Sequence, residues 1–169
     1  MKIEGNAAVV TGGASGLGEA TARALAARGA HVAILDKSQQ NAEKVAHSIG
    51  GLALSCDVTD PVRAQDALDE AARAHGGARI LVNCAGVGVA ARILGRDGPM
   101  PLEDFEQVIR INLIGTFNMM RLAAAQMATL EPIEDGSRGA IVNTASVAAT
   151  DGQIGQSAYA ASKGGIVSL

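Results

Sequence analysis

A chain of 169 residues is long enough for one domain with a sizeable core and too short for two ordinary ones. Hydrophobic residues make up 48% and charged residues 18%, which excludes disorder, and a net charge of −3 gives no electrostatic footprint for nucleic acid or an anionic membrane. Without a signal peptide or an apolar run of roughly 18 residues, the sequence predicts a soluble, cytoplasmic protein.

Short apolar runs alternate with segments of helical periodicity along the chain. We expect strands at Ala7–Val10, His31–Leu35, Leu52–Cys56, Ile80–Asn83 and Gly139–Asn143. We expect helices at Leu17–Arg28, at Asn41–Ser48, from Asp60-Pro61 onward, and at Leu102–Ala128. Buried strands that alternate with helices indicate an α/β fold, a doubly wound parallel sheet with right-handed crossovers. Residues 1–169 are predicted to form a single domain, with an exposed loop at Arg92–Pro101.

A glycine-rich loop follows the first predicted strand and leads into a helix. Its spaced glycines, Gly12, Gly16 and Gly18, let backbone N–H groups approach a pyrophosphate at a helix N-terminus, although a plain tight turn is the alternative. Asp36, at the end of the second strand, favours the dinucleotide interpretation over that of a solvated turn residue. A carboxylate there accepts hydrogen bonds from the adenosine ribose hydroxyls and repels a 2′-phosphate, which favours NAD over NADP despite the neighbouring Lys37.

Three further positions allow more than one interpretation. Asp57 follows the third strand and is a turn residue, a helix cap or a ligand contact, whereas Gly86 is a simple turn or a close passage beneath a ligand. Asn112 falls within an apolar stripe, where a buried amide must find hydrogen-bond partners. It either ties the helix to a strand, the favoured interpretation, or holds an ordered water near a reaction. The stripe consists of Phe105, Val108, Ile109, Leu113, Thr116, Phe117 and Met120.

The most specific cluster lies near the end of the chain. Tyr159 and Lys163 are four residues apart, so on a helix both side chains project from one face. A lysine ammonium within about 5 Å favours the phenolate and suits the tyrosine to acid/base chemistry. Ser146, which follows the fifth strand, is placed to hold a substrate oxygen beside the phenol. An exposed helical pair is the alternative for Tyr159 and Lys163.

Together these motifs resemble the short-chain dehydrogenase/reductase family over essentially the whole chain, although Cys84 stands where the family usually has Asn. The resemblance implies a Rossmann-type sheet and Tyr159 as general acid/base, with Ser146 orienting the substrate, Lys163 binding the nicotinamide ribose and Asn112 holding a relay water. It implies NAD as cofactor and no metal. The implied NAD contacts are Gly12, Ser15, Gly16, Leu17, Gly18, Asp36, Asp57, Val58, Asn83, Ala85, Gly86, Tyr159 and Lys163.

A narrower group within that family, the type 2 3-hydroxyacyl-CoA dehydrogenases, is similar at Pro101–Phe105, Asn112–Asn118, Asn143–Ala149 and Gly152–Gln156. This similarity implies NAD-linked oxidation of (S)-3-hydroxyacyl-CoA to 3-ketoacyl-CoA in fatty acid metabolism, by a homotetramer. Alternatives are a hydroxysteroid dehydrogenase, a 3-ketoacyl carrier-protein reductase, and a non-catalytic dinucleotide-binding module, against which the intact Ser146, Tyr159 and Lys163 argue.

The family's strand order, 3-2-1-4-5, carries two further expectations. Cys56 and Cys84 would end strands three places apart, about 14 Å, whereas a disulfide needs Cα atoms within about 7 Å. We therefore expect both thiols to be free. The family's sixth and seventh strands and its substrate loop would follow Leu169, so the resemblance implies that residues 1–169 lack the C-terminal part of the domain.

Overall fold

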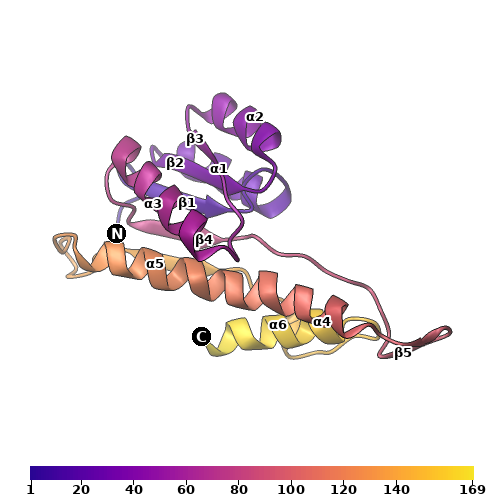
Figure 1. The fold of residues 1–169 in the computed structure, drawn as a ribbon. Helices are drawn as coiled ribbons and strands as arrows, with labels where there is room; N and C mark the ends of the chain where they lie inside the picture. The colour runs from indigo at the N-terminus through magenta and orange to yellow at the C-terminus, as the bar shows by residue number, and fades with distance from the viewer.

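A five-stranded parallel sheet forms the centre of the structure, a computed structural model that describes all 169 residues (Figure 1). The strand order is β3-β2-β1-β4-β7, which confirms the predicted order 3-2-1-4-5. Register is continuous across the sheet, since Thr11 pairs with Leu35 on one side and with Asn83 on the other. The strands are β1 (Ala7–Thr11), β2 (His31–Asp36), β3 (Leu52–Ser55), β4 (Ile80–Asn83) and β7 (Ala140–Asn143).

Helices cover both faces of the sheet, as a doubly wound fold requires. Alternate residues of β1 enter different cores: Val10 packs with α1 (Gly16–Ala26) and α2 (Gln39–Ile49), whereas Val9 packs with α3 (Pro61–His75) and the long helix at Leu102–Ala128. Asp60 caps α3 by accepting hydrogen bonds from the backbone N–H groups of residues 62 and 63, and Pro61 occupies the first turn as predicted.

The predicted long helix is present, but it contains a π-helical turn that the sequence pattern does not show. It consists of α4 (Leu102–Ile109), the π-helix η1 (Arg110–Gly115) and α5 (Thr116–Ala128). A π turn inserts extra residues per turn and shifts the buried face along the sequence. Phe117, expected in the buried stripe, is consequently 51% exposed, while Asn118 and Met119 are buried.

The segment predicted as an exposed loop contains a small hairpin instead of irregular chain alone. Its strands are β5 (Leu94–Gly95) and β6 (Gly98–Pro99), which pair antiparallel. Figure 1 shows this hairpin projecting away from the sheet, and Leu94 is exposed, so the predicted exposure is correct.

The last elements form a layer beside the long helix. The short 3-10 helix η2 (Val147–Ala149) leads to α6 (Ser157–Ser168), which lies against α4 and η1 (Figure 1). β7 pairs only with β4, so it is the edge strand on that side. Both cysteines are free thiols, as predicted, and Cys56 is buried.

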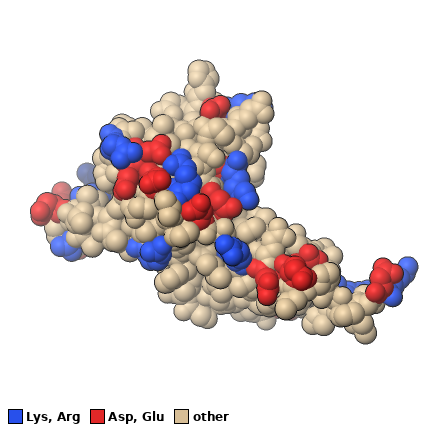
Figure 2. All heavy atoms as spheres, viewed as in Figure 1, with Lys and Arg blue, Asp and Glu red and all other residues tan.

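Charged side chains of both signs lie on the surface. Figure 2 shows acidic and basic side chains interspersed over the face formed by α3 and α4, without a continuous basic patch on that face. None of the helices has the length and apolar character needed to cross a membrane.

Candidate active site

The carboxyl edge of the sheet opens onto a cavity of about 520 Å³. Loops that follow β1, β2, β3 and β4 contribute to it, as does the face of the long helix near residues 107–111. All the predicted cofactor contacts line this cavity except Asn83, Tyr159 and Lys163. The lining residues are Gly12, Ser15, Gly16, Leu17, Gly18, Leu35, Asp36, Lys37, Cys56, Asp57, Val58, Cys84, Ala85, Gly86, Val87, Gln107 and Ile111.

The glycine loop is shaped by two different demands. A Cβ on Gly12 would lie 2.7 Å from the backbone nitrogen of Ala85, and a Cβ on Gly18 would overlap the carbonyl oxygen of Gly12, so close backbone approach excludes any side chain at both positions. Gly16 has a positive φ of 53°, but a Cβ there would meet nothing within 4 Å. The open space at Gly16 belongs to the cavity, at the N-terminus of α1, where backbone N–H groups favour a phosphate.

Asp36 is held by two backbone groups at the end of β2. One carboxylate oxygen accepts a hydrogen bond from the N–H of Ala14 at 3.1 Å, and the other accepts one from Ser38 at 2.9 Å. Each oxygen keeps a further lone pair, because an ionised carboxylate offers about four acceptor sites. The carboxylate is therefore both oriented and able to accept hydroxyl groups from a ligand in the cavity.

Asp57 serves as a turn residue and also lines the cavity, so both interpretations of it find support in the structure. Its Oδ1 accepts hydrogen bonds from the backbone and hydroxyl of Thr59, and its Oδ2 lies 3.1 Å from Nζ of Lys37. Burial opposes ionisation, but the hydrogen bonds from Thr59 and the charge on Lys37 lower the pKa of Asp57 overall. Asp60, rather than Asp57, caps the following helix.

Thr11 and Asn83 support the segment after β4 that lines the cavity. The hydroxyl of Thr11 accepts hydrogen bonds from the backbone N–H groups of Cys84 and Ala85, both at 3.2 Å, and donates one to Oδ1 of Asn83 at 3.3 Å. The amide of Asn83 continues the chain by donating to Oδ1 of Asn143 at 2.9 Å. Asn83, predicted to contact the cofactor, does not line the cavity; its amide is used within the sheet. No role for Thr11 was predicted from the sequence. Its place directly before Gly12, the first glycine of the loop, is the sequence feature that could have indicated one.

Asn112 ties three segments together from the π-helical turn. It is fully buried; its Oδ1 accepts a hydrogen bond from the N–H of Val87, and its Nδ2 donates to the Val87 carbonyl and to Oγ of Ser162. These bonds, of 2.8 to 3.0 Å, connect the long helix to the segment after β4 and to α6. Asn112 is thus a structural tie, as favoured, but it joins the helix to the segment after β4 and to α6 rather than to a strand. The relay water stays a prediction. No role for Ser162 was predicted from the sequence. Its hydroxyl also donates a hydrogen bond to the Tyr159 carbonyl.

Tyr159 and Lys163 project from the same face of α6, as their spacing predicts. The Lys163 Nζ lies 5.6 Å from the centre of the Tyr159 ring and donates a hydrogen bond to the carbonyl of Thr144. Burial, with only 5% of Lys163 exposed, lowers the pKa of its ammonium group, and the nearby Cys84 thiol offsets this in part. The tyrosine ring is half-buried and lies beside Gly88, whose added Cβ would be 3.9 Å from it.

Ser146 stands at the start of η2, which packs against α6. Its hydroxyl oxygen accepts a hydrogen bond from the N–H of Ala148 at 3.2 Å, so its own hydrogen is free to point elsewhere. No hydrogen bond joins Ser146 to Tyr159 directly. The packing of η2 against α6 is what relates the two residues in the structure.

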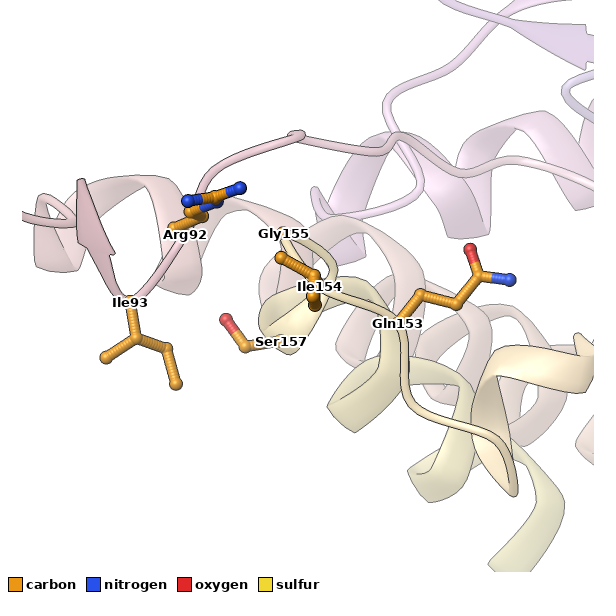
Figure 3. A pocket seen from close by; sticks show the side chains of 6 residues that line it. All are labelled: Arg92, Ile93, Gln153, Ile154, Gly155 and Ser157. Carbon is orange, nitrogen blue, oxygen red and sulfur yellow. The ribbon is translucent and has the colours of Figure 1, made fainter. Parts of the chain in front are cut away.

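A second hollow, of about 350 Å³, lies where the segment before the hairpin meets the N-terminus of α6 (Figure 3). The backbone N–H of Ala91 donates to the Gly155 carbonyl at 3.0 Å, which holds the two segments side by side. The side chains in Figure 3 that line this hollow are Arg92, Ile93, Gln153, Ile154 and Ser157. Its lining residue Ser157 precedes Tyr159 by two positions in the sequence. No group of three or more His, Cys, Asp or Glu side chains is placed to hold a metal ion.

A family model described as short chain dehydrogenase matches residues 6–169. The chain belongs to this family. Members use a nicotinamide dinucleotide, and the open cradle at Gly16 together with the oriented carboxylate of Asp36 fits the phosphate and ribose groups of such a cofactor.

Individual family members agree with this assignment. The chain is 47% identical to 3-hydroxyacyl-CoA dehydrogenase type-2 of Bos taurus and 46% identical to that of Homo sapiens, over 99% of this chain and 66% of each relative. It is also 40% identical to D-threitol dehydrogenase of Mycolicibacterium smegmatis, over 100% of this chain and 63% of that relative.

Among solved structures, 3-hydroxyacyl-CoA dehydrogenase type-2 from Mycobacterium avium matches with a TM-score of 0.93 and 43% identity, covering all of this chain and 68% of that one. The chain thus spans about two thirds of the length of these family members.

Proposed function

We propose that this chain carries the cofactor site and catalytic residues of an NAD-dependent oxidoreductase that interconverts a secondary alcohol and a ketone. The observation that carries the proposal is the placement of Tyr159 and buried Lys163 on one helix face, tied through Asn112 to the loop that borders the dinucleotide cavity. A family relationship alone leaves the chemistry open, whereas this arrangement supplies a group that transfers a proton.

Different residues along the cavity would hold different parts of NAD. Backbone N–H groups of the glycine loop at the N-terminus of α1 would hold the pyrophosphate, Asp36 would accept the adenosine ribose hydroxyls, and the loop at Asp57 and Val58 would border the adenine. Bound NAD would supply the two-electron acceptor for oxidation of the alcohol. NAD rather than NADP is favoured because a 2′-phosphate would face the carboxylate of Asp36.

The proton chemistry falls to Tyr159. In the direction of oxidation the phenolate oxygen takes the proton of the substrate hydroxyl, and in reduction the phenol returns it to the carbonyl oxygen. Lys163 favours the phenolate by its charge, and since only the Thr144 carbonyl accepts from it, two of its three N–H donors remain for ribose hydroxyls. The free hydrogen of Ser146 is available to a substrate oxygen.

We further propose 3-hydroxyacyl-CoA as the substrate, because relatives named 3-hydroxyacyl-CoA dehydrogenase type-2 are 46–47% identical over nearly the whole chain. Because a relative named D-threitol dehydrogenase is 40% identical, other substrates should be assayed beside 3-hydroxyacyl-CoA. Hydroxysteroids and ketoacyl carrier-protein substrates are the alternatives. We also propose that the protein forms a homotetramer and acts in the cytoplasm. Ile114, Phe117 and Val167, on the long helix and α6, are half-exposed apolar side chains, which supports association of subunits.

The first prediction tests the proposed proton transfer by the Tyr159→Phe variant in the full chain. We expect turnover of 3-hydroxyacyl-CoA with NAD to fall about 10²- to 10⁴-fold, because the transferable proton is lost. Affinity for NADH should stay within about threefold, since the ring remains. Turnover above about a tenth of the parent value would reject Tyr159 as the acid/base.

A further inference from the structure

The loop after β3 borders the cavity at the end where adenine would lie, and a buried amide on α5 holds it. Nδ2 of Asn118 donates a hydrogen bond to the backbone carbonyl of Val58 at 2.8 Å. The two residues are 6% and 7% exposed. Val58 and its neighbour Asp57 both line the cavity, so this contact joins the long helix to the cofactor site.

Arg121 fixes the orientation of that amide. Its Nε and Nη2 atoms donate to Oδ1 of Asn118 at 3.1 and 2.7 Å. A guanidinium group has donors only, so the amide oxygen must face Arg121 and the amide nitrogen must face the Val58 carbonyl. The Asn118 amide is therefore held in one of its two flip states by a neighbour one turn away on the same helix.

A second contact holds Val58 from the preceding turn of the helix. A Cβ on Gly115 would lie 2.5 Å from Cγ2 of Val58, so the valine side chain fits against the helix only because position 115 has no side chain. Gly115 and Asn118 are three residues apart and share one helix face. Val58 is thus fixed both through its side chain and through its carbonyl.

The polar contacts of Asp57 cannot replace this anchor. Thr59, which donates to Oδ1, belongs to the same loop, and Lys37, which pairs with Oδ2, is 72% exposed at its side chain. Exposed ion pairs contribute little, typically below about 1 kcal/mol. The hydrogen bond from Asn118 is the buried polar contact that joins this loop to the long helix, beside the packing of the Val58 side chain.

We infer that Asn118, held by Arg121, is a positioning residue that sets the Asp57–Val58 loop for recognition of the adenine base. The inference rests on the proposed dinucleotide site. It makes one helix responsible for both ends of that site, because Asn112 on the same helix holds the segment after β4 and α6. Asn118 itself does not line the cavity, so its effect on binding is transmitted through Val58.

Adenine recognition is measured by comparing two dinucleotides that differ only in the base. Nicotinamide hypoxanthine dinucleotide lacks the amino group of adenine, so titration of NAD and of this analogue isolates the contribution of the loop. Asn118→Leu should weaken NAD about tenfold and the analogue less than about twofold, the size expected when one base contact is lost. Gln126→Leu is the control, because the Gln126 side-chain amide on the same helix donates a 2.7 Å hydrogen bond to the Asp69 carboxylate, and neither residue lines the cavity.

Arg121→Gln provides a second variant that leaves Asn118 in place but releases its amide to flip. We expect the same selective loss for NAD, about threefold, and it decides the matter if Asn118→Leu does not fold. Equal losses for both dinucleotides, or no loss in either variant, would overturn the positioning role while leaving the dinucleotide site intact. Failure of the parent protein to bind either dinucleotide would overturn the proposed function and this inference with it.

Discussion

The proposed cofactor side and the proposed catalytic side of this molecule are built in contrasting ways. The cavity is formed at the carboxyl edge of four consecutive paired strands, where register fixes Thr11, Asp36 and Asn83 relative to one another. The proposed catalytic residues instead lie at the start of η2 and on α6, beside the edge strand β7. Side-chain hydrogen bonds join this part to the rest of the fold, among them those from Asn112 to Ser162 and from Lys163 to Thr144.

The difference shows which contacts fix the geometry of each side. Backbone hydrogen bonds and glycine contacts define the cofactor side, so a single Cβ is enough to disturb it. Side-chain contacts define the proposed catalytic side. Conservative substitutions there should leave the free energy of unfolding nearly unchanged while they reduce activity. The changes that follow test this contrast, from the largest expected effect to the smallest.

Two glycine variants should separate close backbone approach from open space on the cofactor side. Gly12→Ala combines a positive φ of 64° with a 2.7 Å contact to Ala85, so we expect destabilisation of about 3 kcal/mol and loss of measurable NAD binding. Gly16→Ala meets no neighbouring atom and should destabilise by only about 1 kcal/mol while weakening NAD through its Cβ in the cavity. Urea unfolding and NAD titration measure both; equal destabilisation would contradict the contrast.

Lys163→Met tests the catalytic side. We expect NAD-linked turnover to fall about 100-fold or more, because the phenolate of Tyr159 loses its neighbouring charge. The free energy of unfolding should stay equal or rise, since a buried ammonium whose pKa is lowered by burial is replaced by an apolar chain. Steady-state kinetics and urea unfolding at one pH give both quantities. A large loss of stability together with activity would indicate a structural lysine.

Asp36→Ala should narrow the preference for NAD over NADP by about tenfold, because removal of the carboxylate removes its repulsion of a 2′-phosphate. Lys37→Ala is the paired control, since Lys37 lies at the same rim but pairs with Asp57. Titration of both cofactors with both variants measures the effect. If only Lys37→Ala alters the ratio of affinities, the cation rather than the carboxylate governs the choice.

The smallest effect is expected on the opposite edge of the sheet, where His75 stacks on His31 with ring centres 5.8 Å apart. Burial, and then the nearby His31, lower the pKa of His75 below its usual 6.5. The unfolded chain therefore binds more protons between the lowered pKa and 6.5, and stability rises with pH across that window. His75→Gln should flatten this rise by less than about 1 kcal/mol, since the ring is partly exposed.

Urea unfolding of the parent and of His75→Gln at several pH values from about 5 to 7.5 makes that comparison. NAD affinity should agree between the two proteins within about twofold. A steeper pH dependence in the variant would show that the sign assigned to His75 is wrong.

Much of the fold followed from local patterns. Strand positions came from apolar runs ended by glycine or polar residues, and the strand order followed from the family resemblance. The π-helical turn did not, because nothing in the sequence of Arg110–Gly115 distinguishes a π turn from an α turn. The misplacement of Phe117 follows from that omission. The hairpin at Leu94–Pro99 was also missed, since two-residue strands carry too few alternating positions to be recognised.

The candidate site divides in the same way. Sequence by itself determined the glycine loop, Asp36, and the Tyr159–Lys163 pair, because each rests on short-range spacing that fixes shared geometry within one turn or one strand end. Only the tertiary structure decided that Asn83 supports the segment after β4 rather than lining the cavity, that Asn112 joins Val87 and Ser162, and that Asn118 holds Val58. Those contacts join residues 25 to 60 positions apart, and an amide can pair with any donor or acceptor that the fold brings within reach.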